Sequence, residues 1–526
     1  MDTPPPSTTD GDCAAGAVDS RFITAEREIA YDTDALAIFD ALATEHNSLL
    51  LEAADIESKK NVQCLAVLDA ALKVTCVEQR VTATALTATG EVMLDRLDEQ
   101  LAQYRTSRGV YEFTPSHDID ERARLKAVSN AEVLRQLQLH AGYSSEMLPF
   151  VGGGFAFDYL ATFEQLPAVM AGPNEYPDYE FIVAQTVLHI DHLTSHAKVF
   201  GVGVDAAELD ARLAREHNVG ASASKDAPCN ETEGDLAAAG ERTVRAIADI
   251  SDADFRAAVE KMQGNIYGGD IYQVVPARSF SINCPDALAA YRKLRETNPS
   301  PYMFYIRGED YELIGASPES NLKFSADTRE VQLYPIAGTR PRGATHELDI
   351  RNELEMRTDI KEVAEHTMLV DLARNDLARV AVPGTRRVAD LLQVDRYSRV
   401  MHLISRVVAT LHPDFDALDA YRACMNMGTL TGAPKLRAIE LLREFEGKRR
   451  GSYGGAIGYL KGDGSMDNCI VIRSAFIKNG SAVVQAGAGV VRDSVPQSEA
   501  DETVHKAYAV LHAIAAAQNA TLEVVR

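Results

Sequence analysis

The stretch Ser498-Glu-Ala-Asp-Glu-Thr-Val-His-Lys-Ala-Tyr-Ala-Val-Leu predicts an amphipathic helix near the end of the chain. Ser498 and Asp501 match a capping box, and Pro496 stands just upstream, as it does at many helix starts. At about 100° per residue, one face of this helix is polar and a stripe of apolar residues lies roughly opposite. The polar face carries Glu499, Glu502 and Lys506. An ordinary surface helix and a cation site explain this face equally well.

The segment before this helix, Gln485-Ala-Gly-Ala-Gly-Val-Val, predicts a strand that ends in a tight loop. The small residues Gly487, Ala488 and Gly489 would let backbone N–H groups approach a carboxylate or a phosphate closely. The rival interpretation is a plain strand end. The missing third glycine of the dinucleotide fingerprint argues against a dinucleotide site.

A second acidic stretch lies upstream and reads Glu355-Met-Arg-Thr-Asp-Ile-Lys-Glu-Val-Ala-Glu-His-Thr-Met-Leu-Val. Steps of three and four residues predict that its acids share one helix face. These acids are Glu355, Asp359, Glu362 and Glu365. Either neighbouring basic residues in solvent or a bound metal must compensate their charge. Carboxylates from two such helices can hold Mg²⁺ and leave positions for substrate oxygens.

Two further polar residues stand in apolar segments. Arg473 interrupts the strand-like run Cys469-Ile-Val-Ile-Arg-Ser-Ala-Phe, and a buried arginine needs an anionic partner, either a structural carboxylate or a substrate. His402 lies in Val400-Met-His-Leu-Ile. A lone histidine in such a segment is more often a hydrogen-bonded core residue than a catalyst, so its position alone decides nothing.

Composition places the chain among globular proteins of enzyme size. It has 526 residues, 46% of them hydrophobic and 25% charged. The net charge of −24 argues against a nucleic-acid surface, and an anionic substrate would need a local positive site or a metal. No apolar stretch reaches the roughly 18 residues of a membrane helix. Seven cysteines without a Cys-x-x-Cys pair favour a reducing cytoplasm.

The sequence predicts a short tail, two lobes and a linker. Residues 1–20 lack a basic start and an apolar core, so they indicate a disordered tail rather than a signal peptide. Residues 21–215 mix strand-like and helical patterns and form the expected N-terminal lobe. Residues 216–240, rich in Ala, Ser, Gly and Asp, form the expected linker. Residues 241–526 would then form the catalytic domain.

Several strings together resemble the chorismate-utilising enzymes, and among them anthranilate synthase component I, over nearly the whole chain. The strings are Leu49-Leu-Leu-Glu-Ala-Ala-Asp-Ile, Asn298-Pro-Ser-Pro-Tyr-Met-Phe, Gly315-Ala-Ser-Pro-Glu-Ser, Pro335-Ile-Ala-Gly-Thr-Arg-Pro-Arg-Gly, His366-Thr-Met-Leu-Val-Asp-Leu-Ala-Arg-Asn-Asp-Leu, Asp395-Arg-Tyr-Ser-Arg-Val-Met-His, Cys424-Met-Asn-Met-Gly-Thr-Leu-Thr-Gly-Ala-Pro-Lys and Pro496-Gln-Ser-Glu-Ala-Asp-Glu. The resemblance implies an α+β fold with two packed, largely antiparallel sheets, helices outside and the active site between the sheets.

The same resemblance implies a site that combines the acidic stretches with the loop. Glu365 and Glu502 would bind Mg²⁺ directly, with Glu362 and Glu499 close by or acting through water. The implied chorismate contacts are Gly338, Thr339, Tyr453, Arg473, the backbone of Gly487, Ala488 and Gly489, and Lys506. These donors would hold a dicarboxylate in an otherwise acidic protein.

The implied reaction is that of a Mg²⁺-dependent carbon–oxygen lyase in two steps. Ammonia adds at C2 of chorismate as the C4 hydroxyl leaves, and the enolpyruvyl side chain then leaves as pyruvate while the ring aromatises to anthranilate. Hydroxide is a poor leaving group, so a general acid is needed, and the resemblance points to Glu319. His402 would assist the second step, in which a ring proton is removed, and Thr429 would line the ammonia pocket.

Two positions bear on the choice among related activities. Isochorismate and salicylate synthases use a lysine base where this chain has Gln273, and aminodeoxychorismate synthases typically carry lysine where it has Ala337. Both residues favour anthranilate synthase. An aminodeoxychorismate synthase and a non-catalytic tryptophan sensor remain the alternatives, although the joint presence of the catalytic residues speaks against the sensor.

The resemblance also implies a partner and a regulator. None of the seven cysteines lies in a Gly-x-Cys-x-Gly setting, so ammonia would come from a separate glutamine amidotransferase subunit. L-Tryptophan would bind the N-terminal lobe as feedback inhibitor, near residues that match Pro301, Tyr302 and Met303. The family usually has serine where this chain has Ala53, so we expect weakened inhibition.

Overall fold

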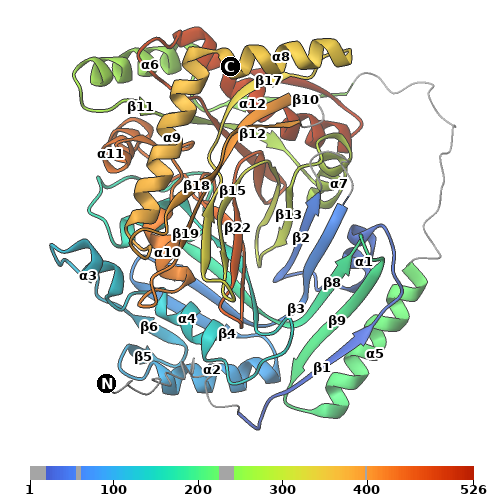
Figure 1. Cartoon of the computed structure of the whole chain (residues 1–526). Coiled ribbons are helices and arrows are strands. Elements are labelled where there is room, and N and C mark those ends of the chain that lie inside the picture. Colours follow the sequence, from blue (N-terminus) through green and yellow to red (C-terminus); the bar gives the residue numbers. More distant parts are fainter. Residues whose placement is uncertain (1–18, 55–60, 224–241, 397–399) are drawn as a thin grey trace, which may run out of the picture.

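The computed structural model describes residues 19–54, 61–223, 242–396 and 400–526, and it combines peripheral helices with long antiparallel sheets (Figure 1). The expected tail lies outside the described residues up to residue 18. The helices are α1 (Ala35–Leu42), α2 (Ala88–Gln100), α3 (Glu121–Lys126), α4 (Glu132–Leu139), α5 (Ala206–Ala223), α6 (Asp252–Tyr267), α7 (Ala287–Thr297), α8 (His346–Thr358), α9 (Ile360–Ala378), α10 (Ala417–Cys424), α11 (Lys435–Glu446), α12 (Pro496–Ala517) and the 3-10 helix η1 (Phe157–Thr162).

The first sheet runs through segments from both halves of the chain. Its strands pair in the order β1 (Ile23–Glu28), β9 (His196–Gly203), β8 (Tyr179–Asp191), β3 (Asn61–Val77), β2 (Ser48–Ala54), β13 (Tyr302–Arg307), β14 (Glu312–Ser317), β23 (Ser474–Lys478), β24 (Ser481–Gly487), β12 (Ala277–Asn283), β10 (Thr243–Ala248) and β25 (Thr521–Val525). Within this order the β10–β25 pair is parallel and the other pairs are antiparallel.

The second sheet branches from the same central pair, β3 and β8. It continues on one side through β4 (Arg80–Ala85), β6 (Val110–Glu112) and β5 (Arg105–Ser107), and on the other through β7 (Phe150–Phe155), β21 (Ala456–Lys461), β22 (Met466–Ile470), β15 (Ser320–Ser325), β16 (Glu330–Leu333) and β19 (Val400–Thr410). Two more strands pair with β19, namely β17 (Ile336–Pro341) and β18 (Arg387–Arg396). A separate ribbon joins β11 (Gln273–Val274) to β20 (Gly432–Ala433).

The strands β3 and β8 connect the two sheets because each is long enough to belong to both. They have 17 and 13 residues, and their mutual register shifts between Val67 and Leu72. Such irregularities bend a strand. The first part of β3 pairs with β2 and the last part with β4, so the two sheets form one closed hydrogen-bonded network. The α+β class with largely antiparallel sheets is thus confirmed.

The expected boundary between the lobes differs from the structure at its start. Helix α5 continues to Ala223, so residues 216–223 are helical rather than the beginning of a linker. Alanine is the best helix former, and the composition that suggested a linker here also suits a helix end. Residues 224–240 lie outside the described part. The pairs β2–β13 and β7–β21 join the segments on either side of this boundary.

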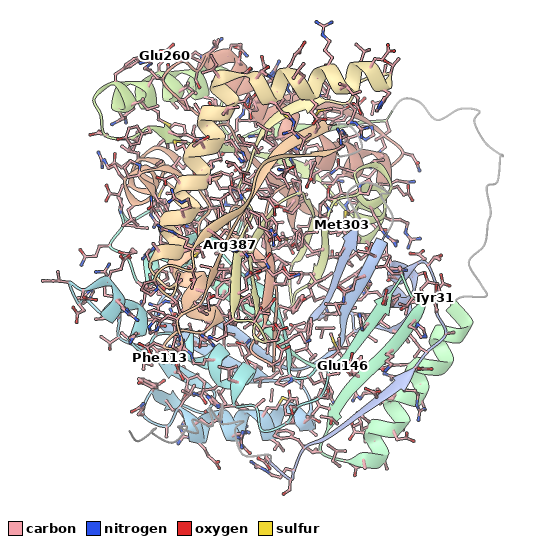
Figure 2. All side chains as sticks on the ribbon, viewed as in Figure 1. Tyr31, Phe113, Glu146, Glu260, Met303 and Arg387 are labelled. Atoms are coloured by element: carbon pink, nitrogen blue, oxygen red, sulfur yellow. The ribbon has the colours of Figure 1, made fainter. Side chains whose placement is uncertain are left out.

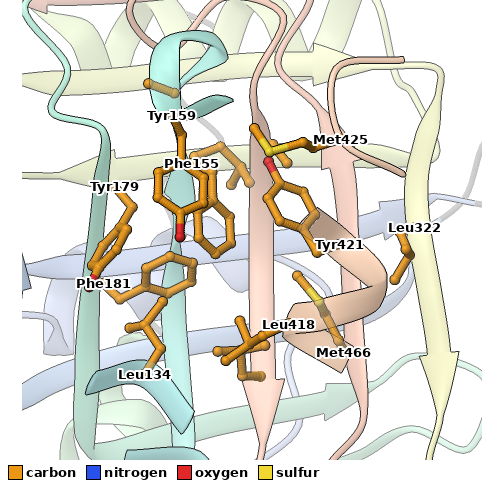
Figure 3. Close-up of a cluster of buried hydrophobic side chains, with 14 of the residues drawn as sticks. Leu134, Phe155, Tyr159, Tyr179, Phe181, Leu322, Leu418, Tyr421, Met425 and Met466 are labelled. Carbon is orange, nitrogen blue, oxygen red and sulfur yellow. The ribbon is translucent and has the colours of Figure 1, made fainter. Parts of the chain in front are cut away.

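An aromatic cluster fills the space where β7 and β8 face helix α10 (Figure 3). Phe155 stacks on Tyr421 at 4.3 Å between ring centroids and meets Phe181 edge to face at 4.9 Å. A second core lies beneath α1, α5, α7 and α12 and includes Phe39, Tyr291 and Leu511. In the described residues, no helix is long and apolar enough to span a membrane.

Candidate active site

Helix α12 begins earlier than the sequence predicts. Its first residue is Pro496, Val495 is the N-cap, and no side chain caps the N-terminus. Proline suits the first helical position because it lacks the N–H that would otherwise be unsatisfied there. Ser498 therefore lies inside the first turn, and the predicted capping box with Asp501 is wrong.

The second acidic stretch does not form one helix. Asp359 ends α8 and caps α9, and its Oδ1 accepts hydrogen bonds from the N–H groups of Lys361 (2.9 Å) and Glu362 (3.2 Å). An N-cap aspartate leaves the helical backbone conformation and so interrupts the 3.6-residue pattern. Glu355 consequently lies on the other helix, exposed, where it accepts from Arg351 at 3.0 Å. The predicted four-acid face is wrong, and Glu362 and Glu365 remain together on α9.

Carboxylates of α9 and α12 lie close enough to influence one another's charge. Burial raises the pKa of Glu365, and Glu362 and Glu502 raise it further, although Lys361 lowers it. Burial also raises the pKa of Glu499 to about 7, with a contribution from the negative charge of Glu502. The structure thus brings together the two acidic groups that are far apart in sequence.

Basic side chains offset part of this negative charge. Arg340 of β17 donates to Glu362 at 2.7 Å and to Asp359 at 2.9 Å. Burial would raise the pKa of Glu502, but Lys506, which pairs with it at 2.7 Å, and Glu499 turn the shift downward. The sequence analysis assigned no role to Arg340. The only sequence feature that pointed to it is its position in the family string that begins at Pro335.

The donor set of these helices suits Mg²⁺ chemically. Mg²⁺ is usually held by one or two carboxylates, with waters or substrate oxygens completing the shell. Glu365 of α9 and Glu502 of α12 provide two such carboxylates, and a bound cation would relieve the repulsion between them. In the part of the chain that the structure describes, no group of three or more His, Cys, Asp or Glu side chains forms a complete metal cluster.

Glu319 lies in the turn between β14 and β15 and is buried, with 5% of its surface exposed. Burial raises its pKa to about 8, against smaller opposing effects of Thr429 and Lys506. The Thr429 hydroxyl donates to Oε1 of Glu319 at 3.1 Å. The carboxyl group is therefore protonated at neutral pH, which is the state that a general acid requires.

His402 of β19 has the opposite protonation behaviour. Its Nδ1 lies 3.0 Å from the carbonyl oxygen of Gly338. Burial lowers its pKa to about 4, and the positive charges of Arg473 and Lys506 add to this effect, so the imidazole is neutral. With Nδ1–H donating to Gly338, Nε2 is the nitrogen that can accept a proton.

The backbone at Gly338 explains how this contact forms. The register between β17 and β19 shifts between Ala337 and Thr339, and Gly338 has a φ of +76°. Only glycine adopts this conformation without strain, and a Cβ here would also lie 3.2 Å from Oε2 of Glu362. The Thr339 backbone pairs with His402, whereas its side chain lies outside the described part.

Arg473 follows β22 and has a left-handed backbone conformation with φ +51°. Its Nη1 donates to the carbonyl oxygen of Lys506 at 2.6 Å. Burial lowers its pKa, and Tyr453 and Glu502 oppose this shift. Within the described residues no carboxylate lies within ion-pair distance of its guanidinium group. The sequence left two possible partners for Arg473, a structural carboxylate or a substrate. Among the described residues, no structural carboxylate fills this role.

The loop at 487–489 is partly committed to other contacts. The Ala488 N–H donates to the carbonyl oxygen of Pro276 at 3.1 Å, so this predicted anion contact is already occupied. Strand β12 pairs with β24, and this pairing brings the Pro276 carbonyl oxygen close to the Ala488 N–H. Lys506 Nζ donates to the carbonyl oxygen of Gly487 at 3.0 Å. Burial raises the pKa of the adjacent Tyr453 hydroxyl to about 12.

Gln273 borders the same loop from β11. The side chain is buried, and its Oε1 has no hydrogen-bond partner in the described residues. A Cβ added to Gly489 would lie 3.1 Å from its Nε2, so glycine permits the close approach. Gln273 is thus adjacent to the predicted substrate loop.

The residues predicted to bind an inhibitor lie on or next to the neighbouring strands β2 and β13. Met303 of β13, labelled in Figure 2, is opposite Glu52 of β2, and Ala53 follows directly. The hydroxyl of Tyr302 donates to Asp467 at 3.4 Å. Pro301 immediately precedes β13, so the four residues come from one small region. Residues 55–60, which follow Ala53, lie outside the described part.

Comparison with known proteins identifies close relatives over most of the chain. Anthranilate synthase component 1 of Escherichia coli is 48% identical over 510 residues, which cover 94% of this chain and 97% of that protein. The protein of the same name from Vibrio parahaemolyticus is 47% identical over 510 residues, with coverage of 93% and 92%.

Solved structures are similar as well. Anthranilate synthase component I from Streptococcus pneumoniae superimposes with a TM-score of 0.67 at 29% identity, and covers 85% of this chain and 92% of its own length. The menaquinone-specific isochorismate synthase MenF of Escherichia coli gives a TM-score of 0.64 at 17% identity, with 95% of each chain covered, which shows a shared fold. Residues 88–512 match the family described as chorismate binding enzyme. This chain therefore belongs to the chorismate binding enzyme family.

Proposed function

We propose that this chain is the chorismate-converting subunit of an anthranilate synthase, which forms anthranilate and pyruvate from chorismate and ammonia at the start of tryptophan biosynthesis. The single observation that carries the proposal is the 48% identity of this chain, over 94% of its length, to anthranilate synthase component 1 of Escherichia coli, and the electrostatics of Glu319 and His402 agree with it. The pKa of Glu319 is raised to about 8 and that of His402 is lowered to about 4. One group can donate a proton and the other can accept one at neutral pH.

Each step of the reaction then has a residue suited to it. In the first step, protonated Glu319 gives its proton to the C4 hydroxyl, which leaves as water while ammonia bonds to C2. Thr429 holds the Glu319 carboxyl by its hydrogen bond. In the second step, neutral His402 removes the proton at C2 as the enolpyruvyl group leaves, and protonation of that group gives pyruvate.

The positive groups would bind the substrate. Arg473, which has no carboxylate partner among the described residues, would accept a chorismate carboxylate, and the Tyr453 hydroxyl and the Gly487 and Gly489 backbone would contribute polar contacts. Gly338, Thr339 and Lys506 complete the proposed contacts. Glu365 and Glu502 would hold Mg²⁺, with Glu362 and Glu499 nearby. When bound, Mg²⁺ would stabilise negative charge that develops on the ring carboxylate.

An aminodeoxychorismate synthase is the alternative. Ala337 disfavours that activity, and Gln273 disfavours the related enzymes that add water to chorismate. Ala337 offers no side-chain amine to attack the ring, and Gln273 offers no lysine base to activate water. The orphaned Oε1 of Gln273 would instead accept a hydrogen bond from ammonia. Analysis of the product from chorismate and ammonium salt separates the two activities, because only anthranilate synthase releases anthranilate and pyruvate together.

A separate glutamine amidotransferase subunit would supply ammonia in the cytoplasm. The name of the relatives, component 1, supports the existence of a second component. The five cysteines among the described residues are all buried, which does not suit a glutaminase nucleophile. We expect the purified chain to use ammonium salt but not glutamine. Glutamine-dependent anthranilate formation by this chain alone would contradict the proposal.

The metal assignment is tested by Glu365→Ala and Glu502→Ala. Each variant should lose anthranilate fluorescence from chorismate, ammonium salt and Mg²⁺, and should also lose the Mg²⁺-dependent rise in melting temperature. The variants should remain folded without Mg²⁺, because removing one carboxylate relieves repulsion. Glu355→Ala is the matched control, since this exposed acid of the same sequence stretch lies on α8. Near-normal activity and Mg²⁺ response in both test variants would show that these acids are merely solvated.

A further inference from the structure

A small cavity lies between segments of the N-terminal part of the chain and the ends of α9 and α10. Its walls include Ser129 after α3, Thr162 of η1, Arg379 at the end of α9 and Arg422 of α10. The cavity has a volume of about 20 Å³. A water molecule or one small ion fits such a space.

The charge of Arg422 distinguishes this cavity. Three arginines in the described residues are buried, and two of them pair with a carboxylate: Arg278 with Asp252 at 2.8 Å and Arg450 with Glu446 at 2.6 Å. Arg422 is 5% exposed, but none of the described carboxylates lies within ion-pair distance of it. Buried charges are normally paired, because an isolated one is costly to desolvate.

The described contacts of Arg422 do not include an ion pair, although burial raises the pKa of Asp419 and the charge of Arg422 is among those that oppose this rise. Its Nη1 donates to the carbonyl oxygen of Leu125 at 3.2 Å, and its guanidinium carbon lies 4.9 Å from the ring centroid of Phe163. The two acids in the cavity wall already have partners, since Glu121 pairs with Arg379 and Glu164 pairs with Arg124. The wall therefore carries an excess of one positive charge.

Unsatisfied hydrogen-bonding atoms gather at the same cavity. Nε of Arg379, Nε of Arg422 and Oγ1 of Thr162 are all buried without a hydrogen-bond partner in the described part. All three residues line the cavity. Guanidinium nitrogens only donate and a hydroxyl group can donate, so the ligand that satisfies all three must accept hydrogen bonds. An acceptor that also carries negative charge is an anion.

We propose that this cavity binds a small inorganic anion of about the size of chloride. The ion would neutralise Arg422 and accept hydrogen bonds from Arg379 and Thr162. It would thereby connect η1 to α9, which carries Glu365, and to α10, which leads to Thr429. The proposal is independent of the reaction proposed above.

Thermal unfolding of the full chain tests this site. Sodium chloride titrated against sodium gluconate at constant ionic strength should raise the melting temperature of the native chain by about 1–2 °C and then saturate. Arg422→Gln and Thr162→Val should each weaken or abolish this rise. Thr162→Val keeps the shape of the side chain and removes a hydroxyl that has no hydrogen-bond partner among the described residues, so this variant should fold even if Arg422→Gln does not.

The matched control is Arg329→Gln. Arg329 also lies over a phenylalanine, Phe324, and donates to backbone carbonyl groups, but it is not part of the cavity wall. Its variant should keep the chloride response. An unchanged response in Arg422→Gln and Thr162→Val, or none in the native chain, would overturn the proposal.

Diffraction locates the ion directly. Crystals grown with bromide in place of chloride should show an anomalous peak between Arg379 and Arg422. An ordered water without an anomalous signal at that position would overturn the proposal. A melting-temperature response to phosphate but not to chloride would overturn the assignment to an ion of chloride size.

Discussion

Two of the regions that contain buried charged groups treat those groups differently. On strand β2, the Glu52 side chain is buried and accepts hydrogen bonds from Arg295 at 3.0 Å and from the Tyr291 hydroxyl at 2.8 Å. Arg295 also pairs with Asp34 at 2.6 Å. In the candidate active site, Arg473 lacks a carboxylate partner among the described residues, and burial forces Glu319 to keep its proton.

The contrast separates structural charges from chemical ones. A buried ion pair with satisfied hydrogen bonds holds its elements in place, and it loses much energy when one partner is removed. Groups whose protonation or charge is left unbalanced are available to a substrate, and such groups cluster at functional sites. The region under β2 would therefore position the predicted inhibitor residues, whereas the region around Glu319 would perform the reaction.

The largest expected effect is that of Glu319→Gln. Glutamine preserves the shape of the side chain but cannot act as a general acid, so anthranilate formation should fall by roughly 10²- to 10⁴-fold. Fluorescence of anthranilate at saturating chorismate and ammonium salt measures this rate. Asp327→Asn, in the turn after β15, serves as an exposed control and should keep the native rate. Substantial activity in Glu319→Gln would remove this residue from the mechanism.

The same carboxyl group predicts a pH dependence of both rate and stability. At a constant concentration of unprotonated ammonia, the rate should fall as pH rises through about 8, where Glu319 loses its proton. Because the pKa of Glu319 is raised in the folded state, the folded chain binds more protons than the unfolded chain between about pH 4.5 and pH 8. The free energy of unfolding should therefore fall as the pH rises through this range. Glu319→Gln should flatten both profiles, as rate measurements and urea unfolding at pH 6 to 9 would reveal.

Breaking the paired region should affect stability instead of catalysis. Arg295→Met removes the arginine that pairs with the buried Glu52, so the free energy of unfolding should fall by about 3–5 kcal/mol. The lower end is expected because the Arg295 side chain is 19% exposed. Urea unfolding measures the loss, and Arg295→Met with Glu52→Gln should recover part of it. A fully stable single variant with impaired catalysis would reverse the comparison.

Arg473→Gln should affect substrate binding much more than stability. The variant loses a charged contact to the substrate, which is worth about 1.5–3 kcal/mol, so KM for chorismate should rise by about 10- to 150-fold. Its melting temperature should fall only slightly, since the variant loses the hydrogen bond to the Lys506 carbonyl oxygen but no described carboxylate loses a partner. Steady-state kinetics and thermal unfolding together check both points. Lower stability with an unchanged KM would identify Arg473 as a structural residue.

The smallest expected effect lies beside the paired region, at Ala53→Ser. Restoring the serine usual in the family adds one hydroxyl hydrogen bond to tryptophan, worth about 0.5–1.5 kcal/mol, and should lower the inhibitory tryptophan concentration by about 2- to 10-fold. Inhibition curves of the native chain and the variant under the same conditions measure this change. Identical curves would mean that a water molecule or a neighbouring side chain already replaces the hydroxyl.

Local sequence rules failed where two signals competed for the same residues. The acids from Glu355 to Glu365 follow helical spacing, but Asp359 is also a strong N-cap and divides the stretch into α8 and α9. Likewise, Ser498 and Asp501 fit a capping box, but Pro496 starts the helix first. In each case the backbone preference of one residue overrode the side-chain pattern.

The sequence by itself determined which residue types are present at the candidate site, the family, and the mixed character of the fold, because these depend on local patterns and on long matching strings. Only the tertiary structure decided that the acids of α9 and α12 influence one another, that Pro276 occupies the Ala488 amide, and that Glu319 and His402 have opposite protonation. The physical reason is that desolvation and charge interactions depend on distance in space, which the bent strands β3 and β8 and the closed sheet network set between segments far apart in the chain.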